Sequence, residues 1–159
     1  MKEIPLSQGK IALVDDEDYE FLVGMGKWCV SNNYAAISNH YYLHGKRKTK
    51  IIRMHRLLMG FPVEIHVDHI NGDKLDNRRV NLRLCTRSEN AKNSKKPIVN
   101  SSGYKGVFKV SPNRWQAKIK SNGIQINLGS FSNKIDAAKA YNVGAIKYHG
   151  EFARINEIP

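Results

Sequence analysis

Cysteine is scarce in this chain. The two cysteines, Cys29 and Cys85, lie far apart and form no C-x-x-C pair. A disulfide framework and a four-cysteine zinc site are therefore excluded, because both need more cysteines at closer spacing. Each thiol is expected to be a small buried apolar side chain.

Long apolar runs are missing as well. No stretch reaches the ~18 apolar residues of a bilayer span, and the N-terminus, MKEIPLSQGK, lacks the basic-then-apolar order of a secretory signal. We therefore expect an intracellular, cytoplasmic protein with no membrane partner. A length of 159 residues excludes a large enzyme barrel, and 41% hydrophobic with 25% charged residues is typical of a folded chain.

Acidic side chains are few relative to basic ones. The chain has 26 Lys and Arg against 14 Asp and Glu, a net charge of +12, although residues 1–20 hold six acidic and only two basic residues. Residues 83–120 contain ten basic residues and a single acidic one, Glu89. Two separate basic clusters favour an extended contact with nucleic acid over a solvated surface or an anionic membrane. The second cluster comprises Lys46, Arg47, Lys48, Lys50, Arg53 and Arg56.

Residues 1–60 alternate short apolar or aromatic runs with turn residues. The acidic stretch from Asp15 to Glu20 is typical of the start of a helix, and Asn32-Asn33 and Gly45 mark turns. We expect a small mixed β-rich region that leads into the next segment. Its strands are expected in KIALVDD, KWCVSNNYAAIS, YYLHG and KIIRMHRLLMG.

Residues 61–96 predict a strand, a loop, a second strand and a short helix. The strands are expected in HVDHI and NLRLC, and NGDKLDNRRV forms the loop. Thr86 and Glu89 form a T-x-x-E capping box, which predicts a helix start with Asn90 on its first turn. Residues 97–103 contain Pro, Ser and Gly and are expected to be a linker.

Residues 104–159 show the clearest periodicity. In RWQAKIK, Trp115, Ala117 and Ile119 share one face, and polar residues occupy the other; the same alternation resumes after the Asn122-Gly123 turn. YKGVFKV is expected to add a third strand. The apolar spacing in KIDAAKAYNVGAIKYHG predicts an amphipathic helix that covers the apolar sheet face. The fold class is therefore α+β, ending in a three-stranded antiparallel sheet packed on one helix.

Asp68 and His69 stand next to each other at the end of the strand expected in HVDHI. Because side chains alternate along a strand, both can serve one site only if the strand ends or bends there. Asn71-Gly72, directly afterwards, favours such a bend.

The residue types around this bend suit phosphodiester hydrolysis. Mg²⁺ prefers oxygen ligands, which Asp68 and Asn90 would supply, with water and phosphate completing the shell. His69 would accept a proton from the attacking water, and the Asn81 amide would hold its imidazole in one orientation.

The stretch HVDHINGDKLDNRRVNLRLCTRSEN resembles the HNH nucleases with their ββα-metal motif. The resemblance implies that His69 is the general base, Asp68 the first metal ligand, Asn81 the structural Asn and Asn90 the ligand on the helix. Asn in place of the last His resembles phage and intron-encoded homing endonucleases, which implies one Mg²⁺ or Mn²⁺, no small-molecule cofactor, and a bacterial or phage-infected host. MHRLLMGF resembles the entry to the same module, where His55 is expected to be structural or to contact phosphate.

The loop between the two strands contains further charged residues. Asp73, Asp76 and Asn77 are expected to be turn residues, because the segment lacks the Gly and the closing Glu of a calcium loop. Phosphate contacts are expected from the arginines that follow, and one of them would stabilise the transition state. These are Arg78, Arg79, Arg83 and Arg87.

Residues 104–156 resemble the Apetala-type, or ethylene-response-factor, DNA-binding domain. The carriers are Y-x-G-V at 104–107, W-x-A-x-I at 115–119, L-G-x-F at 128–131, A-A-x-A-Y at 137–141 and the closing segment 150–156. The resemblance implies a three-stranded sheet in the DNA major groove with a helix behind it. It places Lys105, Arg114, Lys118, Lys120, Gln125 and Asn127 on the strands that face DNA.

Together these features predict a monomeric metal-dependent HNH endonuclease, homing-like, that hydrolyses a phosphodiester bond in duplex DNA. The alternatives are a non-catalytic, sequence-specific DNA-binding regulator and an RNA-binding protein. Besides the C-terminal residues named above, we expect DNA contacts from Arg53, Arg56, Arg83 and Arg87.

Overall fold

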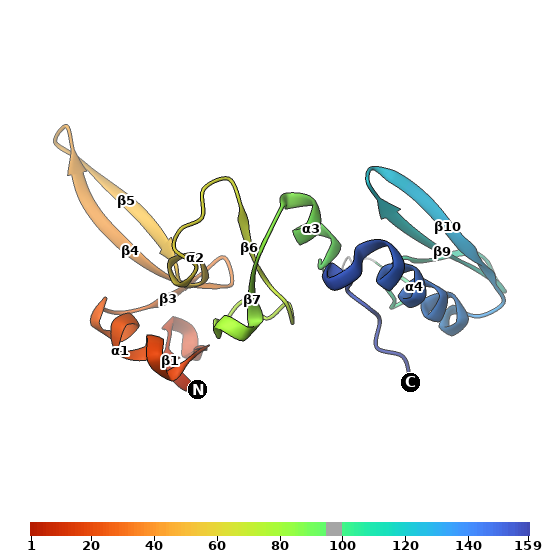
Figure 1. Ribbon diagram of the computed structural model, residues 1–159, viewed down its shortest axis with the longest axis horizontal. Coiled ribbons are helices and arrows are strands. Elements are labelled where there is room, and N and C mark those ends of the chain that lie inside the picture. Colours follow the sequence, from red (N-terminus) through yellow and green to blue (C-terminus); the bar gives the residue numbers. More distant parts are fainter. Residues whose placement is uncertain (95–99) are drawn as a thin grey trace. The chain divides into compact units, whose positions relative to one another are not determined.

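The computed structural model describes residues 1–94 and 100–159, and the chain forms two compact units, Met1–Arg87 and Ser88–Pro159 (Figure 1). The expected linker begins at residues 97–99, which lie outside the described residues. Its remainder is a turn in which the Asn100 amide and the Ser102 hydroxyl donate to the carbonyl oxygen of Tyr104.

The first unit combines three small antiparallel sheets with two helices. The sheet orders are β1-β2, β3-β4-β5 and β6-β7. Its elements are β1 (Lys2–Pro5), β2 (Ile11–Val14), α1 (Asp16–Gly24), β3 (Cys29–Ser31), β4 (Tyr34–Leu43), β5 (Lys46–Arg53), α2 (Met54–Leu58), β6 (His66–His69) and β7 (Leu82–Cys85), with 3₁₀ turns at Ser7–Gly9 and Arg79–Asn81.

Most of the sequence expectations for this unit are confirmed. The turns fall at Asn32-Asn33 and at His44-Gly45, all with positive φ, and α1 begins within the acidic stretch. The expectation of one strand through KIIRMHRLLMG is wrong, because the strand stops at Arg53 and α2 follows. Met54 and Leu58 are both buried, and their spacing of four residues brings them to the same side of a helix.

One apolar core joins the first 60 residues to β6 and β7. Trp28 and Leu22 are almost completely buried in it, and Val67 from β6 and Leu82 from β7 belong to the same cluster. The loop after β6 is tied to β2 as well, because Leu13 exchanges backbone hydrogen bonds with Leu75 and Asn77. The strands of the nuclease-like stretch therefore rest on a scaffold that the N-terminal residues supply.

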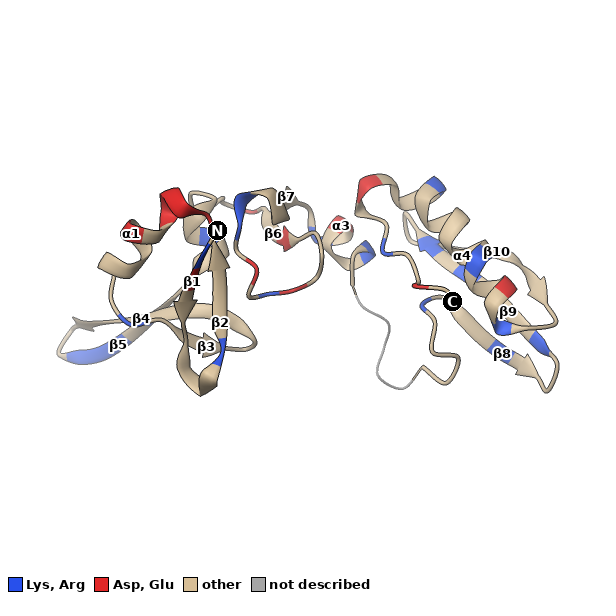
Figure 2. Ribbon diagram, turned by 90° about the horizontal axis from the view of Figure 1, so that it is seen from below, with Lys and Arg blue, Asp and Glu red and all other residues tan. Residues whose placement is uncertain are grey.

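The β4–β5 hairpin extends well beyond this core. Every residue from Ser38 through Ile51 is exposed, including Tyr42 at 75%. Basic residues lie along β5, as the blue segments in Figure 2 show. We call residues 38–51 the basic arm.

The second unit has the architecture that the periodicity predicts. Its elements are α3 (Arg87–Lys92), β8 (Val107–Ser111), β9 (Arg114–Ser121), β10 (Ile124–Phe131) and α4 (Lys134–His149). Arg87, the first residue of α3, is also the last residue of the first unit. The sheet order is β10-β9-β8, all antiparallel.

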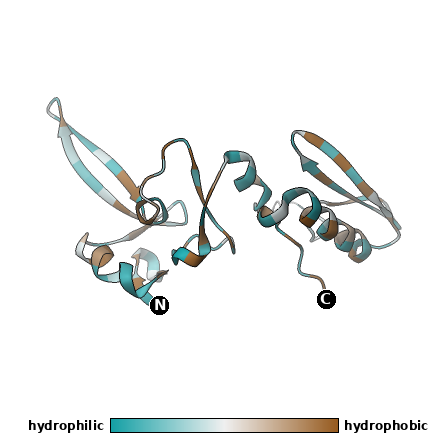
Figure 3. Cartoon of the chain, viewed as in Figure 1, coloured by the Kyte–Doolittle hydropathy of each residue, from teal (hydrophilic) through white to brown (hydrophobic). Residues whose placement is uncertain are grey.

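The helix α4 covers the apolar face of this sheet. Ala117 and Ile119 from β9 pack in one cluster with Ala138, Tyr141 and Ala145 from α4. Hydropathy alternates along β9 and β10, as the bands in Figure 3 show. The opposite sheet face is left uncovered by α4 and carries polar side chains.

None of the helices within residues 1–94 and 100–159 has the length and apolar character needed to traverse a bilayer.

Candidate active site

Asp68 and His69 are the last two residues of strand β6. The strand β6 ends at His69, and the Gly72 N–H donates to the His69 carbonyl oxygen at 2.8 Å in the turn that follows. Both side chains are buried, with 6% and 4% of their surfaces exposed. The strand therefore ends at this dipeptide, which is what the sequence required if Asp68 and His69 are to serve one site.

Arg83 lies directly across the β6–β7 pair from Asp68. Its Nε and Nη2 donate to Oδ2 of Asp68 at 3.0 and 2.7 Å. The Arg83 side chain is only 13% exposed. This guanidinium holds the Asp68 carboxylate in the protein interior, and the DNA contact expected of Arg83 stays a prediction.

Two aromatic rings lie beside the imidazole of His69. The ring centroid of His55 is 5.0 Å away in an edge-on arrangement, and that of Tyr34 is 6.0 Å away. Tyr34 and His55 are themselves 4.9 Å apart. Cations lie over the Tyr34 ring, with Lys74 Nζ at 4.5 Å and the Arg53 guanidinium carbon at 5.2 Å. We call Tyr34, His55 and His69 the aromatic cluster.

Burial keeps both histidines of the aromatic cluster neutral near pH 7. Burial is the main cause that lowers the pKa of His69, opposed by the polar interaction with the Asn77 amide and by the Asp68, Asp73 and Asp76 carboxylates. Burial, with positive neighbours, lowers the pKa of His55 to about 3. A neutral imidazole can accept a proton, which is the property that a general base requires.

Asn81 contacts the loop that follows His69 rather than the imidazole itself. Its Oδ1 accepts from the Asn71 N–H at 3.0 Å, and its Nδ2 donates to Asn71 Oδ1 at 3.1 Å and to the Asp76 carbonyl oxygen at 2.8 Å. Asn81 ends the 3₁₀ turn before β7 instead of starting that strand. The amide that acts on the His69 ring is that of Asn77, which the sequence indicated only as a turn residue.

Asp73 begins a turn, as expected, whereas Asp76 forms an isolated parallel β-bridge with Leu13. Asp73 accepts from the Leu75 N–H, and Asp76 accepts from Asn71 and from the Arg78 guanidinium.

Two of the loop arginines are engaged within the protein. Arg78 forms a bidentate pair with Asp76, and Arg79 forms one with Asp18 of α1. The Arg79 N–H also donates to Asp15 at 2.7 Å. Their guanidinium groups therefore hold the loop in place, and the phosphate contacts expected of Arg78 and Arg79 stay predictions.

The residues beside α2 differ in exposure. Arg56 donates to the backbone oxygens of Ile65 and Pro62 and so stabilises the segment before β6. The DNA contact expected of Arg56 stays a prediction. Arg53 is exposed. His55 is 4% exposed, and its Nδ1 has no hydrogen-bond partner among the described residues, which agrees with the structural role expected for it.

The donor set suits a hard divalent cation. Within residues 1–94 and 100–159, no three His, Cys, Asp or Glu side chains converge on a possible metal position. Asp68 offers a carboxylate, and Asn90, half-buried on the first turn of α3, offers an amide oxygen. Each is an oxygen donor of the kind that Mg²⁺ prefers, and their binding of one cation stays a prediction.

Exposed polar side chains line the sheet face opposite α4. Lys118 pairs with Asn127 and Lys120 with Gln125 across β9 and β10, so these four side chains share the outer face. Arg114 is exposed at the start of β9. Of the four paired residues, Lys118 is half-buried and the other three are exposed.

Lys105 does not belong to this outer face. It precedes β8, and its Nζ donates to the carbonyl oxygens of Lys92 and Ser94 at 2.5 and 2.6 Å. Burial lowers the pKa of Lys105 to about 8, with a smaller effect from Arg154. The ammonium group of Lys105 is therefore directed to the end of α3, and the DNA contact expected of Lys105 stays a prediction.

Comparisons with known proteins agree with this architecture. The family model for HNH endonucleases matches residues 58–92. An uncharacterized HNH endonuclease of Acanthamoeba polyphaga mimivirus is 31% identical over 92% of this chain and 84% of its own length. The chain belongs to the HNH endonuclease family.

Other relatives match parts of this HNH family member. Protein 3.8 of Escherichia phage T7 is 34% identical over 58% of the chain and 77% of its own length. An AP2/ERF and B3 domain-containing protein of Oryza sativa subsp. japonica is 41% identical over 35% of the chain and 15% of its own length. The C-terminal region is thus AP2-like, as the sequence motifs indicated. No solved structure matches the chain.

Proposed function

We propose that this HNH family member is a cation-dependent endonuclease that hydrolyses a phosphodiester bond in duplex DNA, one strand per active site, in the manner of homing enzymes. The observation that carries the proposal is the buried, neutral His69 next to Asp68 at the end of β6. A histidine in that state can take a proton from water at neutral pH.

His69 acts as the general base in this proposal. Burial lowers its pKa, so the imidazole is free of a proton before the reaction. Once it takes a proton from the attacking water, the Asp68, Asp73 and Asp76 carboxylates stabilise the resulting imidazolium, because each of them raises the pKa of His69. Asn81 positions the ring indirectly, through its three hydrogen bonds to the loop that begins after His69.

Asp68 and Asn90 would hold the cation, Mg²⁺ or Mn²⁺. When bound, such a cation supplies positive charge to the phosphate and to the leaving oxygen. Arg83 keeps the Asp68 carboxylate in one orientation through two hydrogen bonds. The oxygen donors favour Mg²⁺ and Mn²⁺ over zinc, which prefers nitrogen and sulfur ligands.

The AP2-like domain reads DNA sequence in this proposal. Lys118, Lys120, Gln125 and Asn127 share the outer sheet face, where amides can bond adenine edges and lysines can reach phosphate or guanine. Arg114 and, beside the nuclease strands, Arg53 and Arg87 are exposed and available for phosphate.

The basic arm adds a second DNA contact. Lys46, Lys48 and Lys50 pair with Leu43, Tyr41 and Asn39 across the hairpin, so three lysines share one face of a two-stranded ribbon. A ribbon of this kind is narrow enough to enter the major groove of B-form DNA. One chain therefore carries both the reading and the cutting elements, and we propose that it acts as a monomer.

Plasmid nicking tests the proposal. Supercoiled DNA is incubated with the full chain in Mg²⁺ or Mn²⁺, and in parallel with excess chelator. We expect conversion to the nicked circle in either cation and none with chelator. Tight DNA binding without nicking in any divalent cation would favour a regulator instead, and preference for RNA over duplex DNA in competition would favour an RNA-binding protein.

A further inference from the structure

The helix α3 has little to stabilise it within its own sequence. It has six residues, and none of them is buried. Isolated helices shorter than ~12 residues are marginal in water, and most helices in proteins gain their stability from a buried apolar face. A helix as short and as exposed as α3 needs partners elsewhere in the chain.

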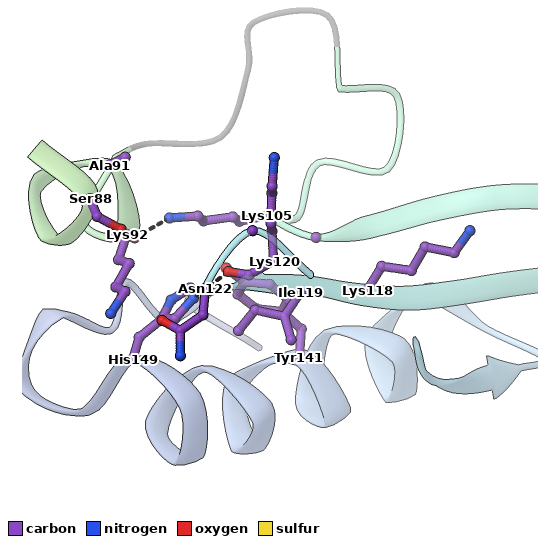
Figure 4. Close-up of a pocket in the computed structure, with 12 residues that line it drawn as sticks. Ser88, Ala91, Lys92, Lys105, Lys118, Ile119, Lys120, Asn122, Tyr141 and His149 are labelled. Atoms are coloured by element: carbon purple, nitrogen blue, oxygen red, sulfur yellow. Dashed lines mark hydrogen bonds between the residues drawn. The ribbon is translucent and has the colours of Figure 1, made fainter. Parts of the chain in front are cut away.

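Lys105 is one such partner. Figure 4 shows its side chain reaching from the segment before β8 to the end of α3. Lys92 is the last residue of α3, so its carbonyl oxygen is among those that have no partner within the helix. The Lys105 ammonium donates to this oxygen and to that of Ser94. A cation at this end also complements the partial negative charge of a helix C-terminus.

The backbone of Lys105 is itself fixed to the AP2-like domain. Its N–H donates to Oδ1 of Asn156 at 2.6 Å, and its carbonyl oxygen accepts from Nδ2 of Asn156 at 3.1 Å. Asn156 in turn exchanges two hydrogen bonds with Asn142 of α4. The residue whose ammonium contacts α3 is therefore connected through Asn156 to α4 of the C-terminal domain.

An open pocket of about 420 Å³ lies beside this attachment (Figure 4). Ser88, Ala91 and Lys92 of α3 line it together with Lys105, Tyr141 and His149 of the domain.

The match to the HNH family model ends at residue 92, so it includes α3, although α3 belongs to the second compact unit from Ser88 onward. We propose that Lys105 is a positioning residue through which the AP2-like domain holds α3, and with it Asn90, in the orientation that binds the divalent cation. This inference rests on the proposed function, in which Asn90 is a cation ligand.

The test compares Lys105→Met with Lys109→Met in the full chain. Lys109 is exposed on β8, so its replacement removes the same charge without touching α3. Hydrogen exchange of the α3 amides is measured by NMR, and Mn²⁺ affinity by electron paramagnetic resonance of the free ion. The amide spectrum of β8–β10 verifies that each variant is folded. If Lys105→Met does not fold, it is replaced by Lys105→Gln, which keeps a hydrogen-bond donor at this position.

We expect Lys105→Met to speed α3 exchange and to raise the Kd for Mn²⁺ by at least about tenfold, because the charge-assisted hydrogen bonds to the Lys92 and Ser94 carbonyl oxygens are lost. Lys109→Met should change neither. Loss of a positive charge alone would tighten Mn²⁺ binding, so weaker binding reports the position of Asn90. Unchanged α3 exchange would overturn the inference, as would faster exchange with unchanged Mn²⁺ affinity. If the wild-type chain binds Mn²⁺ but nicks no plasmid, the proposed catalysis fails while this coupling stands.

Discussion

The guanidinium of Arg83 places both of its hydrogen bonds to Asp68 on a single carboxylate oxygen, Oδ2. The two residues are direct neighbours across β6 and β7, and their side chains are 13% and 7% exposed. Removal of one partner from a buried ion pair leaves an uncompensated charge in the protein, which is costly.

Arg83→Met is therefore expected to lower the free energy of unfolding of the first unit by about 3–5 kcal/mol. Trp28, which is buried in that unit, reports unfolding in urea when Trp115 is replaced by Phe. Mn²⁺ should restore part of the loss, because a bound cation can replace the guanidinium charge next to Asp68. The matched control is Arg47→Met on the exposed basic arm, which should change stability by less than about 0.5 kcal/mol. Equal effects of the two substitutions would contradict the role given to Arg83.

Acid should destabilise the first unit through His55. Burial lowers the pKa of His55 from 6.5 to about 3, so between these pH values the unfolded chain binds a proton that the folded chain does not. The stability is fully present above about pH 6.5 and is lost as the pH falls toward 3, at no more than about 1.4 kcal/mol per pH unit.

His55→Phe keeps an aromatic ring against Tyr34 and His69 but cannot titrate. Urea unfolding followed through Trp28 at pH 7 and pH 5 should show a smaller loss of stability in this variant than in the wild type. His40→Phe, at an exposed position of the basic arm, should leave the wild-type pH dependence unchanged. A His55→Phe variant as sensitive to acid as the wild type would rule out this explanation.

Gly106 should tolerate no side chain. A Cβ atom there would come within 2.0 Å of Cδ2 of Tyr141 and 2.7 Å of the Lys118 carbonyl oxygen, at a φ of +72°. We expect Gly106→Ala to destabilise the AP2-like domain by about 3 kcal/mol or more, the sum of overpacking and backbone strain. Gly123→Ala provides the comparison, because Gly123 has a φ of +81° and open space around it. Gly123→Ala should lower the free energy of unfolding by about 1 kcal/mol. Unfolding followed through Trp115 fluorescence measures the loss of stability in both variants.

The outer sheet face should contribute to the salt dependence of DNA binding. Lys120→Ala is expected to weaken duplex binding and to reduce the slope of log affinity against log salt by about 1, if Lys120 neutralises one phosphate. Lys139→Ala removes an exposed charge from α4, which covers the opposite face, and should leave the slope unchanged. Fluorescence anisotropy at several salt concentrations measures both. Equal slopes for the two variants would place DNA elsewhere on the protein.

The C-terminal fold could be predicted from the sequence because its periodicity is strict. Trp115, Ala117 and Ile119 alternate with polar residues, and the spacing of Ala138, Tyr141 and Ala145 is helical, so local pattern and packing agree. The helix α2 escaped prediction because a run as short as MHRLL has no period long enough to distinguish a strand from a helix.

The partners of the site were harder to predict, because they depend on register and tertiary contact. The Asp68–Arg83 pair requires the exact alignment of β6 and β7 across a long loop, and composition alone treats Arg83 as one more surface charge. His55 and Tyr34 come near His69 only through the shared core of the first unit. The sequence assigns Lys105 to a DNA-facing strand, and only the tertiary structure shows that its ammonium contacts the end of α3.

The central claim is that His69 is the general base of a DNA endonuclease, and His69→Ala tests it most directly. His66→Ala is the control, because His66 is an exposed histidine of the same strand. Nicking rates in Mg²⁺ and duplex affinity in chelator are measured for both variants and the wild type. The account predicts that His69→Ala loses nicking by at least about a hundredfold while its affinity stays within about twofold of wild type, and that His66→Ala keeps both. Nicking by His69→Ala at the wild-type rate would contradict the account.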